Sequence, residues 1–405
     1  MNILAVSTWF PYPPDNGSKQ RAYHLLRALS CSHEVTSLAF SSTAGTVTAA
    51  AAALQPLQSG ARVVAVAEDP FRYVHLPQLA KFLSPIPLAC WPSRKMRSAV
   101  ASAARQKRYD AVVAIQAPAG QYALQIKAVV RILDLDVSLG YQPSSERHVG
   151  GAPSVRARRW ASWLKASRYQ QRLLRSFDLG TVALRDEAEF LQAQFGPAGC
   201  RFAHLDNGVD CASNRPGLAE PSPNALVYNG ALTYSANYDA MRWFLAEVYP
   251  IVKANNPGAS LTITGSTQGV DLDGLAIDDS VRLTGYLEDV RLPVAQAGVC
   301  VVPIRHGGGT RLKILEAMAL GTPVVSTSKG AVGLDVIDGE HLLVADDPAA
   351  FATRTTALLR DAPLRARLAE NARRLVEARY DWGPIGKRFV GLVEEAVMDR
   401  AGRPL

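Results

Sequence analysis

Short apolar runs alternate with amphipathic stretches along this chain of 405 residues, and the alternation occurs twice. In the first half, strands are expected at residues 3–8, 34–40, 62–67, 110–116, 130–136 and 180–184. Continuous apolar strands separated by helices are typical of a parallel sheet that helices cover on both faces. The pattern therefore predicts an α/β fold.

A segment rich in Pro, Ser and Asn, CASNRPGLAEPSPN at residues 211–224, separates the two halves and favours no regular element. Strands are expected again at residues 224–230, 259–265, 281–287, 298–304, 322–327 and 341–346. Because the chain is also too long for one ordinary core, we predict two doubly wound, Rossmann-like domains facing a central cleft. The predicted parts are a first domain at 1–208, a linker at 209–225, a second domain at 226–383 and a final helix at 384–405 that crosses back to the first domain.

The net charge of +8 and the pI near 9.3 favour an anionic partner, such as nucleotide phosphates, lipid diphosphates or a membrane surface. No nucleic-acid-binding pattern accompanies this charge, so we expect no nucleic-acid partner. The five cysteines form no Cys-x-x-Cys pair or Cys/His cluster, which argues against a zinc site. No run of 18 apolar residues and no basic leader occurs, so we expect a cytoplasmic protein, on the inner membrane face if it meets lipid.

The segment VVPIRHGGGTRLKILEAMALGTPVVST, at residues 301–327, carries the strongest functional signal. A strand is expected to end at Ile304, and a glycine run leads to a helix with Thr310 as its N-cap. Glycines before a helix let a ligand approach backbone N–H groups, where the helix dipole favours an anion. Arg311 and Lys313 oppose that dipole in the first turn, at about 0.3–1 kcal/mol per charge, unless an anion is present. This predicts a diphosphate site on the N–H groups of residues 310–312.

Glu316 follows one turn after Lys313 on the same side of the expected helix. Helical side chains lean toward the N-terminus, so its carboxylate is placed to accept hydrogen bonds from the vicinal hydroxyls of a ribose. For Glu316 and Lys313 alone, a solvated helix pair remains the alternative.

At these residues the chain resembles the bacterial glycosyltransferases of family 4, retaining enzymes with the two-domain GT-B fold. The likeness covers nearly the whole chain. It includes the opening strand with its Pro/Gly loop, HLDNGVD (204–210), YNGALTYSANYDAM (228–241), VRLTGYLEDV (281–290) and GGGTRLKILEAMALGTPVVST (307–327).

The resemblance implies a role for each matching residue. Glu316 matches the second glutamate of the family's paired-glutamate motif and would hold the donor ribose, while Tyr286 and Leu287 would hold the base. The residues assigned to the donor diphosphate are Gly17, Gly230, Arg305, Gly308, Gly309, Thr310, Arg311, Leu312 and Lys313. Arg311, Lys313 and Glu316 are the catalytic candidates, and Gln116 and Asp134 are assigned to the acceptor side.

Three positions depart from the family pattern. The first glutamate of the pair is replaced by Gly308, eight residues before Glu316. The basic pair of the second domain falls near Ala231 and Asn237, and Gln116 stands where many members have a histidine. Our hypothesis is that the missing charge is replaced by Arg305, Arg311 or Lys313.

The resemblance implies an EC 2.4 hexosyltransferase that retains the anomeric configuration and uses neither metal nor cofactor. A departing diphosphate would be stabilised by N–H donors and cations, and its oxygen would take the acceptor's proton. Asp134-Leu-Asp136 has the spacing of a metal motif, but these residues close a strand, so we interpret them as strand-end and capping residues. The expected substrates are a nucleotide sugar, with UDP as the guess, and a sugar, lipid-linked or small-molecule acceptor in polysaccharide or glycolipid assembly. A nucleotide-sugar epimerase and a non-catalytic nucleotide-binding subunit are the alternatives.

A basic stretch from Arg147 to Arg175 contains no acidic residue and includes Trp160 and Trp163. It predicts either an interfacial helix that contacts anionic lipid or a surface helix with solvated arginines. We favour the surface helix.

Overall fold

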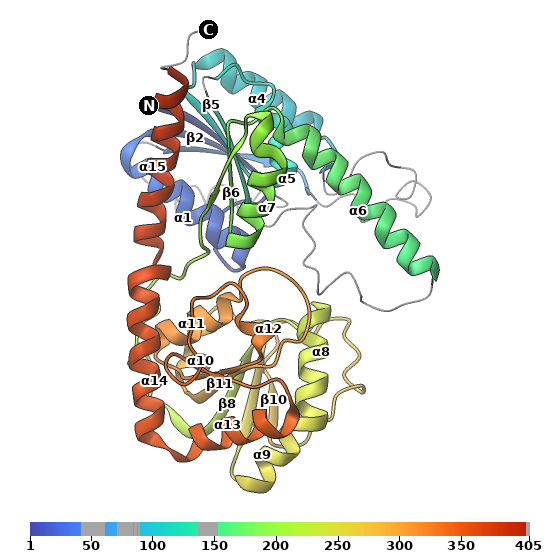
Figure 1. Cartoon of the computed structure of the whole chain (residues 1–405), viewed down its shortest axis with the longest axis vertical. Coiled ribbons are helices and arrows are strands. Elements are labelled where there is room, and N and C mark those ends of the chain that lie inside the picture. The colour runs from blue at the N-terminus through green and yellow to red at the C-terminus, as the bar shows by residue number, and fades with distance from the viewer. Residues whose placement is uncertain are drawn as a thin grey trace. The chain divides into compact units, whose positions relative to one another are not determined.

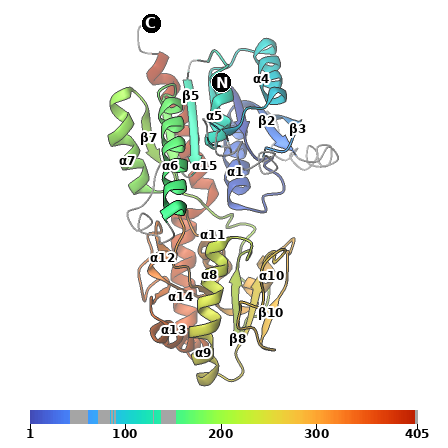
Figure 2. The same ribbon diagram turned by 90° about the vertical axis from the view of Figure 1, so that its right-hand side faces the viewer.

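The structure is a computed structural model that describes residues 1–41, 61–70, 84, 87, 90–128, 130–136 and 153–401. The chain divides into two compact units (Figure 1). The first unit is Met1–Asp206 together with Gly383–Leu405, and the second unit is Asn207–Trp382. Each unit contains one parallel sheet with helices on both of its faces (Figures 1 and 2). The predicted α/β class, with two doubly wound sheets, is confirmed.

The sheet of the first unit has seven parallel strands in the order β3-β2-β1-β4-β5-β6-β7. The strands are β1 Asn2–Ser7, β2 Glu34–Ser41, β3 Ala61–Ala67, β4 Ala111–Ile115, β5 Val130–Asp136, β6 Leu179–Val182 and β7 Arg201–His204. The helices are α1 Gly17–Ser32, α4 Arg94–Gln106, α5 Ala117–Ala123, α6 Pro153–Leu174, α7 Arg185–Phe195 and α15 Trp382–Ala401. Strand β7 was not expected, because it lies at the sheet edge and Phe202 is its one buried residue.

The sheet of the second unit has six parallel strands in the order β10-β9-β8-β11-β12-β13. The strands are β8 Ser222–Asn229, β9 Ser260–Thr264, β10 Val281–Leu283, β11 Ala297–Val302, β12 Val324–Ser326 and β13 Leu343–Val344. The helices are α8 Ser235–Trp243, α9 Tyr249–Asn255, α10 Arg291–Ala295, α11 Leu312–Leu320, α12 Ser328–Ala331, α13 Pro348–Arg360 and α14 Ala362–Leu375. All residues of β11 are buried, as expected of a central strand covered on both faces.

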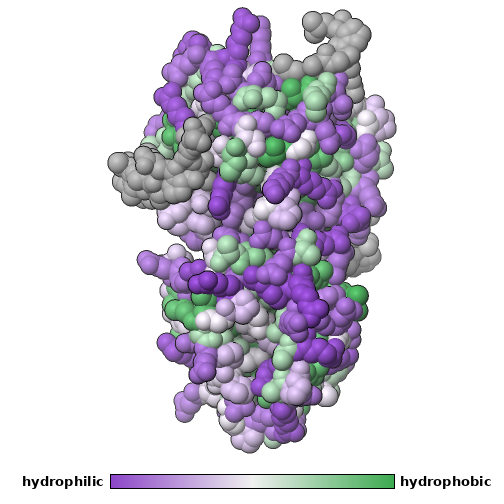
Figure 3. Space-filling view, turned by 90° about the vertical axis from the view of Figure 1, so that its left-hand side faces the viewer, coloured by the Kyte–Doolittle hydropathy of each residue, from purple (hydrophilic) through white to green (hydrophobic). Residues whose placement is uncertain are grey.

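The chain returns to the first unit through α15. Gly386 lies against α1 so closely that a Cβ there would be 2.7 Å from the Cβ of Ala28. An ion pair joins Arg201 to Glu395 at 3.5 Å. The face over α14 and α15 is mainly hydrophilic, with apolar residues in small patches (Figure 3).

The segment 209–225, expected as a linker, groups with the second unit. The N–H of Val209 donates to the carbonyl of Tyr380 at 2.8 Å, and β8 begins within the segment, at Ser222. Among the described residues, no helix is both long and apolar enough to cross a membrane.

Candidate functional site

The glycine run between β11 and α11 forms a loop at the carboxyl edge of the second sheet. Gly307 and Gly309 have φ values of 92° and 82°, which glycine adopts at little cost. The helix begins at Leu312, later than expected, with Arg311 in the N-cap position. The prediction that Thr310 caps this helix is wrong, because its Oγ1 is buried with no hydrogen-bond partner among the described residues. The N–H of Leu312, one of the expected diphosphate donors, donates to the Thr310 carbonyl at 3.1 Å.

Arg311 holds the glycine loop. Arg311 is buried, and its guanidinium donates to the backbone carbonyl oxygens of Gly307, at 2.6 Å, and His306, at 3.3 Å. Exposed Gly308 lies between these anchored residues and Gly309. Arg311, which we expected as a cation in the first helical turn, therefore donates its hydrogen bonds to the backbone of the loop itself.

Lys313 reaches from α11 to the end of β8. Its Nζ donates to the Tyr228 hydroxyl at 2.8 Å and to Asn237 Oδ1 at 3.1 Å, and it lies 4.1 Å from the centre of the Tyr228 ring. The residue as a whole is half-buried, but its ammonium group is enclosed. Burial, with a smaller effect of Arg311, lowers the pKa of Lys313 to about 7. A Cβ on Gly230 would lie 2.5 Å from this Nζ and 2.9 Å from Asn237 Nδ2, so a side chain at position 230 would displace the ammonium group from its observed place.

This arrangement brings a cation to one of the positions where the basic pair was missing. Asn237 accepts from Lys313 and donates from Nδ2 to the carbonyl of Ala231 at 2.8 Å. Of the three proposed replacements, Lys313 is the residue in contact with position 237.

Arg305 has a different partner. It forms an ion pair with Asp239 of α8, with Nη2 2.9 Å from Oδ2 and 3.0 Å from Oδ1. Its guanidinium also lies 5.4 Å from the centre of the Trp243 ring. Arg305 is therefore a surface cation paired with Asp239, and its assignment to the donor diphosphate stays a prediction.

Glu316 lies at the ends of β8 and β9. Its Oε2 accepts from Asn229 Nδ2 at 2.9 Å, and Asn229 Oδ1 accepts from Thr264 Oγ1 at 2.9 Å. Lys313 donates elsewhere, so a simple solvated pair does not describe these two residues. Asn229 and Thr264 were not predicted from the sequence, although each is the last residue of a strand at the edge where ligands bind.

The expected base-binding residues lie in the loop after β10. Tyr286 is 64% exposed and Leu287 is half-buried. The carbonyl of Gly285 accepts from the N–H of Gly265 at 3.0 Å, which ties this loop to the end of β9. The structure therefore gathers Gly230, Lys313 and Glu316 at the same edge of the sheet that carries this loop.

Three predicted residues belong to the first unit. Gly17 is the first residue of α1, beside the N-cap residue Asn16, whose side chain accepts from the N–H of Lys19. Gln116 follows β4 with a positive φ of 73°, and its N–H donates to the Asp134 carbonyl at 2.6 Å.

Asp134 is fully buried, away from the surface where an acceptor would bind. Its carboxylate binds the buried guanidinium of Arg21, at 2.8 Å from Nε and 2.7 Å from Nη2, and accepts from Thr181 Oγ1 at 2.7 Å. The acceptor-side assignment of Asp134 is therefore wrong. Within the described ranges, no three His, Cys, Asp or Glu side chains are grouped to hold a metal ion.

Comparison with known proteins places these residues in an enzyme family. Residues 223–361 match the family described as glycosyl transferases group 1. The chain is 27% identical to a glycogen synthase of Mycobacterium tuberculosis, with 94% of this chain and 92% of that protein aligned. It is 30% identical to a phosphatidyl-myo-inositol mannosyltransferase of Mycobacterium leprae over 53% of this chain and 59% of that protein.

Solved glycosyltransferase structures share the fold. Sucrose-phosphate synthase from Thermosynechococcus elongatus superimposes with a TM-score of 0.71 at 17% identity, covering 98% of this chain and all of that chain. Anabaena HepE in complex with UDP and glucose gives a TM-score of 0.64 at 16% identity, with the same coverage. On these findings the protein is an enzyme of the hexosyl-transferring class with the GT-B fold, and its residues 223–361 are similar to the glycosyl transferases of group 1.

Proposed function

We propose that this enzyme is a retaining, metal-independent glycosyltransferase of family 4 that takes its sugar from a nucleoside diphosphate donor. The observation that carries the proposal is the cluster of Gly230, Lys313 and Glu316 at the carboxyl edge of the second sheet. It combines a cation, a bare glycine backbone and a held carboxylate, which suit a diphosphate joined to a ribose.

The proposed roles follow from these contacts. Lys313 has used two of its three N–H donors on Tyr228 and Asn237, so one is left for a phosphate oxygen. Glu316, held by Asn229, accepts from the ribose hydroxyls, and the loop at Tyr286 receives the base. Arg311 is a positioning residue that holds the glycine loop. Gly17 of the first unit and Gly308 remain predicted neighbours of the phosphates.

Negative charge builds on the diphosphate as the sugar leaves, and the Lys313 ammonium with the N–H groups of the glycine loop would stabilise it. A leaving phosphate oxygen then takes the proton of the acceptor hydroxyl on the same face of the sugar. This route retains the configuration and needs neither a metal nor a strong protein base. It is compatible with glycine at position 308.

We propose UDP as the carrier, because UDP is the nucleotide bound in the HepE structure. The acceptor is proposed to be a saccharide or glycolipid under assembly, in line with relatives named as a glycogen synthase and a phosphatidyl-myo-inositol mannosyltransferase. A small-molecule acceptor is the second candidate.

Calorimetric titration with UDP, GDP and ADP, in the absence of added metal, tests the donor site. We expect micromolar binding of one nucleotide and at least tenfold weaker binding by Glu316→Ala, which corresponds to about 1.4 kcal/mol. The matched control is Glu370→Ala, a helix glutamate of the second unit that is exposed and paired with Arg374. Equal affinities of Glu316→Ala and the control would remove Glu316 from the site.

Turnover distinguishes transfer from the other reactions. The purified enzyme is incubated with sugar nucleotides of the nucleotide that it binds, first without an acceptor and then with a cell extract as the source of acceptors. An isomerised sugar nucleotide formed without acceptor would replace the transferase with an epimerase. Nucleotide binding without turnover in any extract would favour a non-catalytic subunit.

A further inference from the structure

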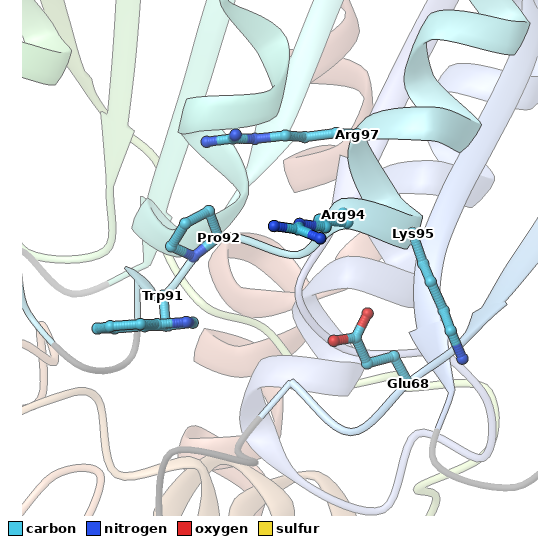
Figure 4. Close-up of a pocket in the computed structure, with 6 residues that line it drawn as sticks. All are labelled: Glu68, Trp91, Pro92, Arg94, Lys95 and Arg97. Atoms are coloured by element: carbon cyan, nitrogen blue, oxygen red, sulfur yellow. The ribbon is translucent and has the colours of Figure 1, made fainter. Parts of the chain in front are cut away.

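A cavity of about 430 Å³ lies in the first unit, at the start of α4, whereas the proposed nucleotide site belongs to the second unit. Its lining residues are Glu68, Trp91, Pro92, Arg94, Lys95 and Arg97 (Figure 4). A narrow neighbouring cavity shares Glu68 and Trp91 with it, and is also lined by Thr8, just after β1, and Tyr122 of α5. This places the cavity at the carboxyl edge of the first sheet, where α/β proteins bind their ligands. Its volume is that of a small-molecule site.

Two guanidinium groups dominate the charge of this cavity. Arg94 and Arg97 are three residues apart on α4, so they share one side of the helix. Both extend toward the side where Trp91 and Pro92 lie (Figure 4). Among the residues that the structure describes, no carboxylate forms an ion pair with Arg94 or Arg97, and both are exposed. A guanidinium binds phosphate or carboxylate through paired N–H donors, so two adjacent ones favour an anionic group.

Lys95 contributes less than the two arginines to the positive charge available in the cavity. Its Nζ donates to the carbonyl of Ala67 at 3.0 Å, and its side chain extends away from Trp91 (Figure 4). Of the described residues that line the cavity, Arg94 and Arg97 are therefore the cations available to a ligand.

The other lining side chains suit a sugar. Trp91 is 42% exposed, and an exposed indole offers a rigid apolar face against which the C–H face of a sugar ring packs. The Glu68 carboxylate accepts a hydrogen bond from Ser93 Oγ, the N-cap residue of α4, which fixes an acceptor for hydroxyl groups in the cavity. A sugar with an attached anionic group would match the aromatic face, the carboxylate and the two cations together.

We propose that this cavity binds the acceptor of the enzyme, and that the acceptor is an anionic saccharide carrying a phosphate or carboxylate group. Arg94 and Arg97 bind the anionic group, and Trp91 packs on the adjoining ring. The inference rests on the proposed transferase function and narrows the acceptor class. A neutral acceptor would leave the guanidinium groups of Arg94 and Arg97 without an anionic partner.

The test titrates the full-length protein with glucose 1-phosphate, glucuronate, glucose and inorganic phosphate, by saturation-transfer NMR for the sugars and calorimetry for phosphate. Saturating UDP is present throughout, so that the second unit does not bind the probes. We expect both anionic sugars to bind the wild type more tightly than glucose does. The double variant Arg94→Gln/Arg97→Gln should weaken their binding at least tenfold. The control Arg105→Gln/Arg108→Gln removes two exposed arginines at the other end of α4, with the same change in net charge, and should bind like the wild type.

The outcomes separate this inference from the proposed function. Anionic-sugar binding that is equal in both double variants would overturn the acceptor cavity, even if UDP binds normally. Inorganic phosphate binding as tightly as glucose 1-phosphate, with no effect of Trp91→Ala on either, would make this a free-anion site and overturn the acceptor assignment. A wild type that binds no nucleotide, yet binds anionic sugars through Arg94 and Arg97, would overturn the donor site while leaving the cavity as a saccharide site.

Discussion

Lys313 places its ammonium group in an enclosed position within the second unit. Its ammonium group is enclosed by the ring and hydroxyl of Tyr228 and the amide of Asn237, and burial lowers its pKa to about 7. A neutral amine attracts a diphosphate far less than an ammonium group does. The protonation state of Lys313 should therefore be coupled to donor binding.

We predict that UDP binding takes up a proton above pH 7. The free lysine is mostly neutral at pH 8, and a bound diphosphate stabilises the charged form, so the pKa is higher in the complex. By linkage, affinity falls as the pH rises from about 7 toward the pKa of the complex. Titrations at pH 8 in PIPES and in Tris should differ in apparent enthalpy by the ionisation heat of the protons absorbed.

Lys313→Met is the matched variant, since it keeps most of the side-chain length and removes the charge. It should bind UDP at least tenfold more weakly at pH 6.5 and show no buffer dependence at pH 8. A wild type whose binding enthalpy is the same in both buffers would contradict the coupling.

The sequence predicted which residue types form the site, but it did not predict their contacts. Residues 307–316 indicated an anion site because glycines, cations and a carboxylate occur together before a helix. The same pattern did not show that Arg311 would hold the loop or that Arg305 would pair with Asp239, since those partners come from backbone geometry and from another helix. Asp134 was misassigned because its partner Arg21 is 113 residues away; the spacing of Arg21 to Leu25 and Leu29 on the buried face of α1 was the available signal.

At the scale of the element, apolar runs predicted the strands well, because a strand buried on both faces has few polar positions. Strand β7 was missed because an edge strand needs only one buried residue. The start of α11 was placed too early, because Thr310 has the residue type of a cap without the bonds of one. Helix ends depend on such single contacts, and strand centres do not.

Helix α6 remains a candidate for lipid contact. It runs from Pro153 to Leu174 and exposes Arg156, Arg158, Arg168 and Arg172, and Trp160 is 62% exposed. Its N-terminal part projects from the sheet of its own unit (Figure 1). The earlier part of the basic stretch, residues 147–152, lies outside the described residues.

If α6 is interfacial, sedimentation with vesicles should rise with their anionic lipid content, and Trp160→Ala should reduce it several-fold. The control is Phe190→Ala, which removes an exposed aromatic side chain from α7 of the same unit. Binding that is independent of anionic lipid would assign α6 to the solvated surface helix that we favoured from the sequence.

At the scale of the whole molecule, the first unit is built from both ends of the chain. Phe389 of α15 is fully buried, and α15 groups with the first unit. We predict that Phe389→Ala destabilises the first unit by about 3–5 kcal/mol, through loss of burial and the cavity left behind.

Hydrogen exchange followed by mass spectrometry checks where this effect falls. Faster exchange is expected in peptides from β1, β4 and α1 but not in peptides from β8 or α11, because β8 and α11 belong to the second unit. Met398→Ala, on the same helix but 65% exposed, is the control. Faster exchange confined to β8 and β11 would contradict the assignment of α15 to the first unit.

The return of α15 also sets an order of events on the ribosome. Domains generally fold as they emerge, N-terminal first. Here the first 206 residues emerge without the helix that covers part of their surface, while the whole of Asn207–Trp382 is still to be translated. At about 5–20 residues per second this interval lasts roughly ten to thirty-five seconds. The second unit can therefore complete its own core before α15 is available to pack on the first unit.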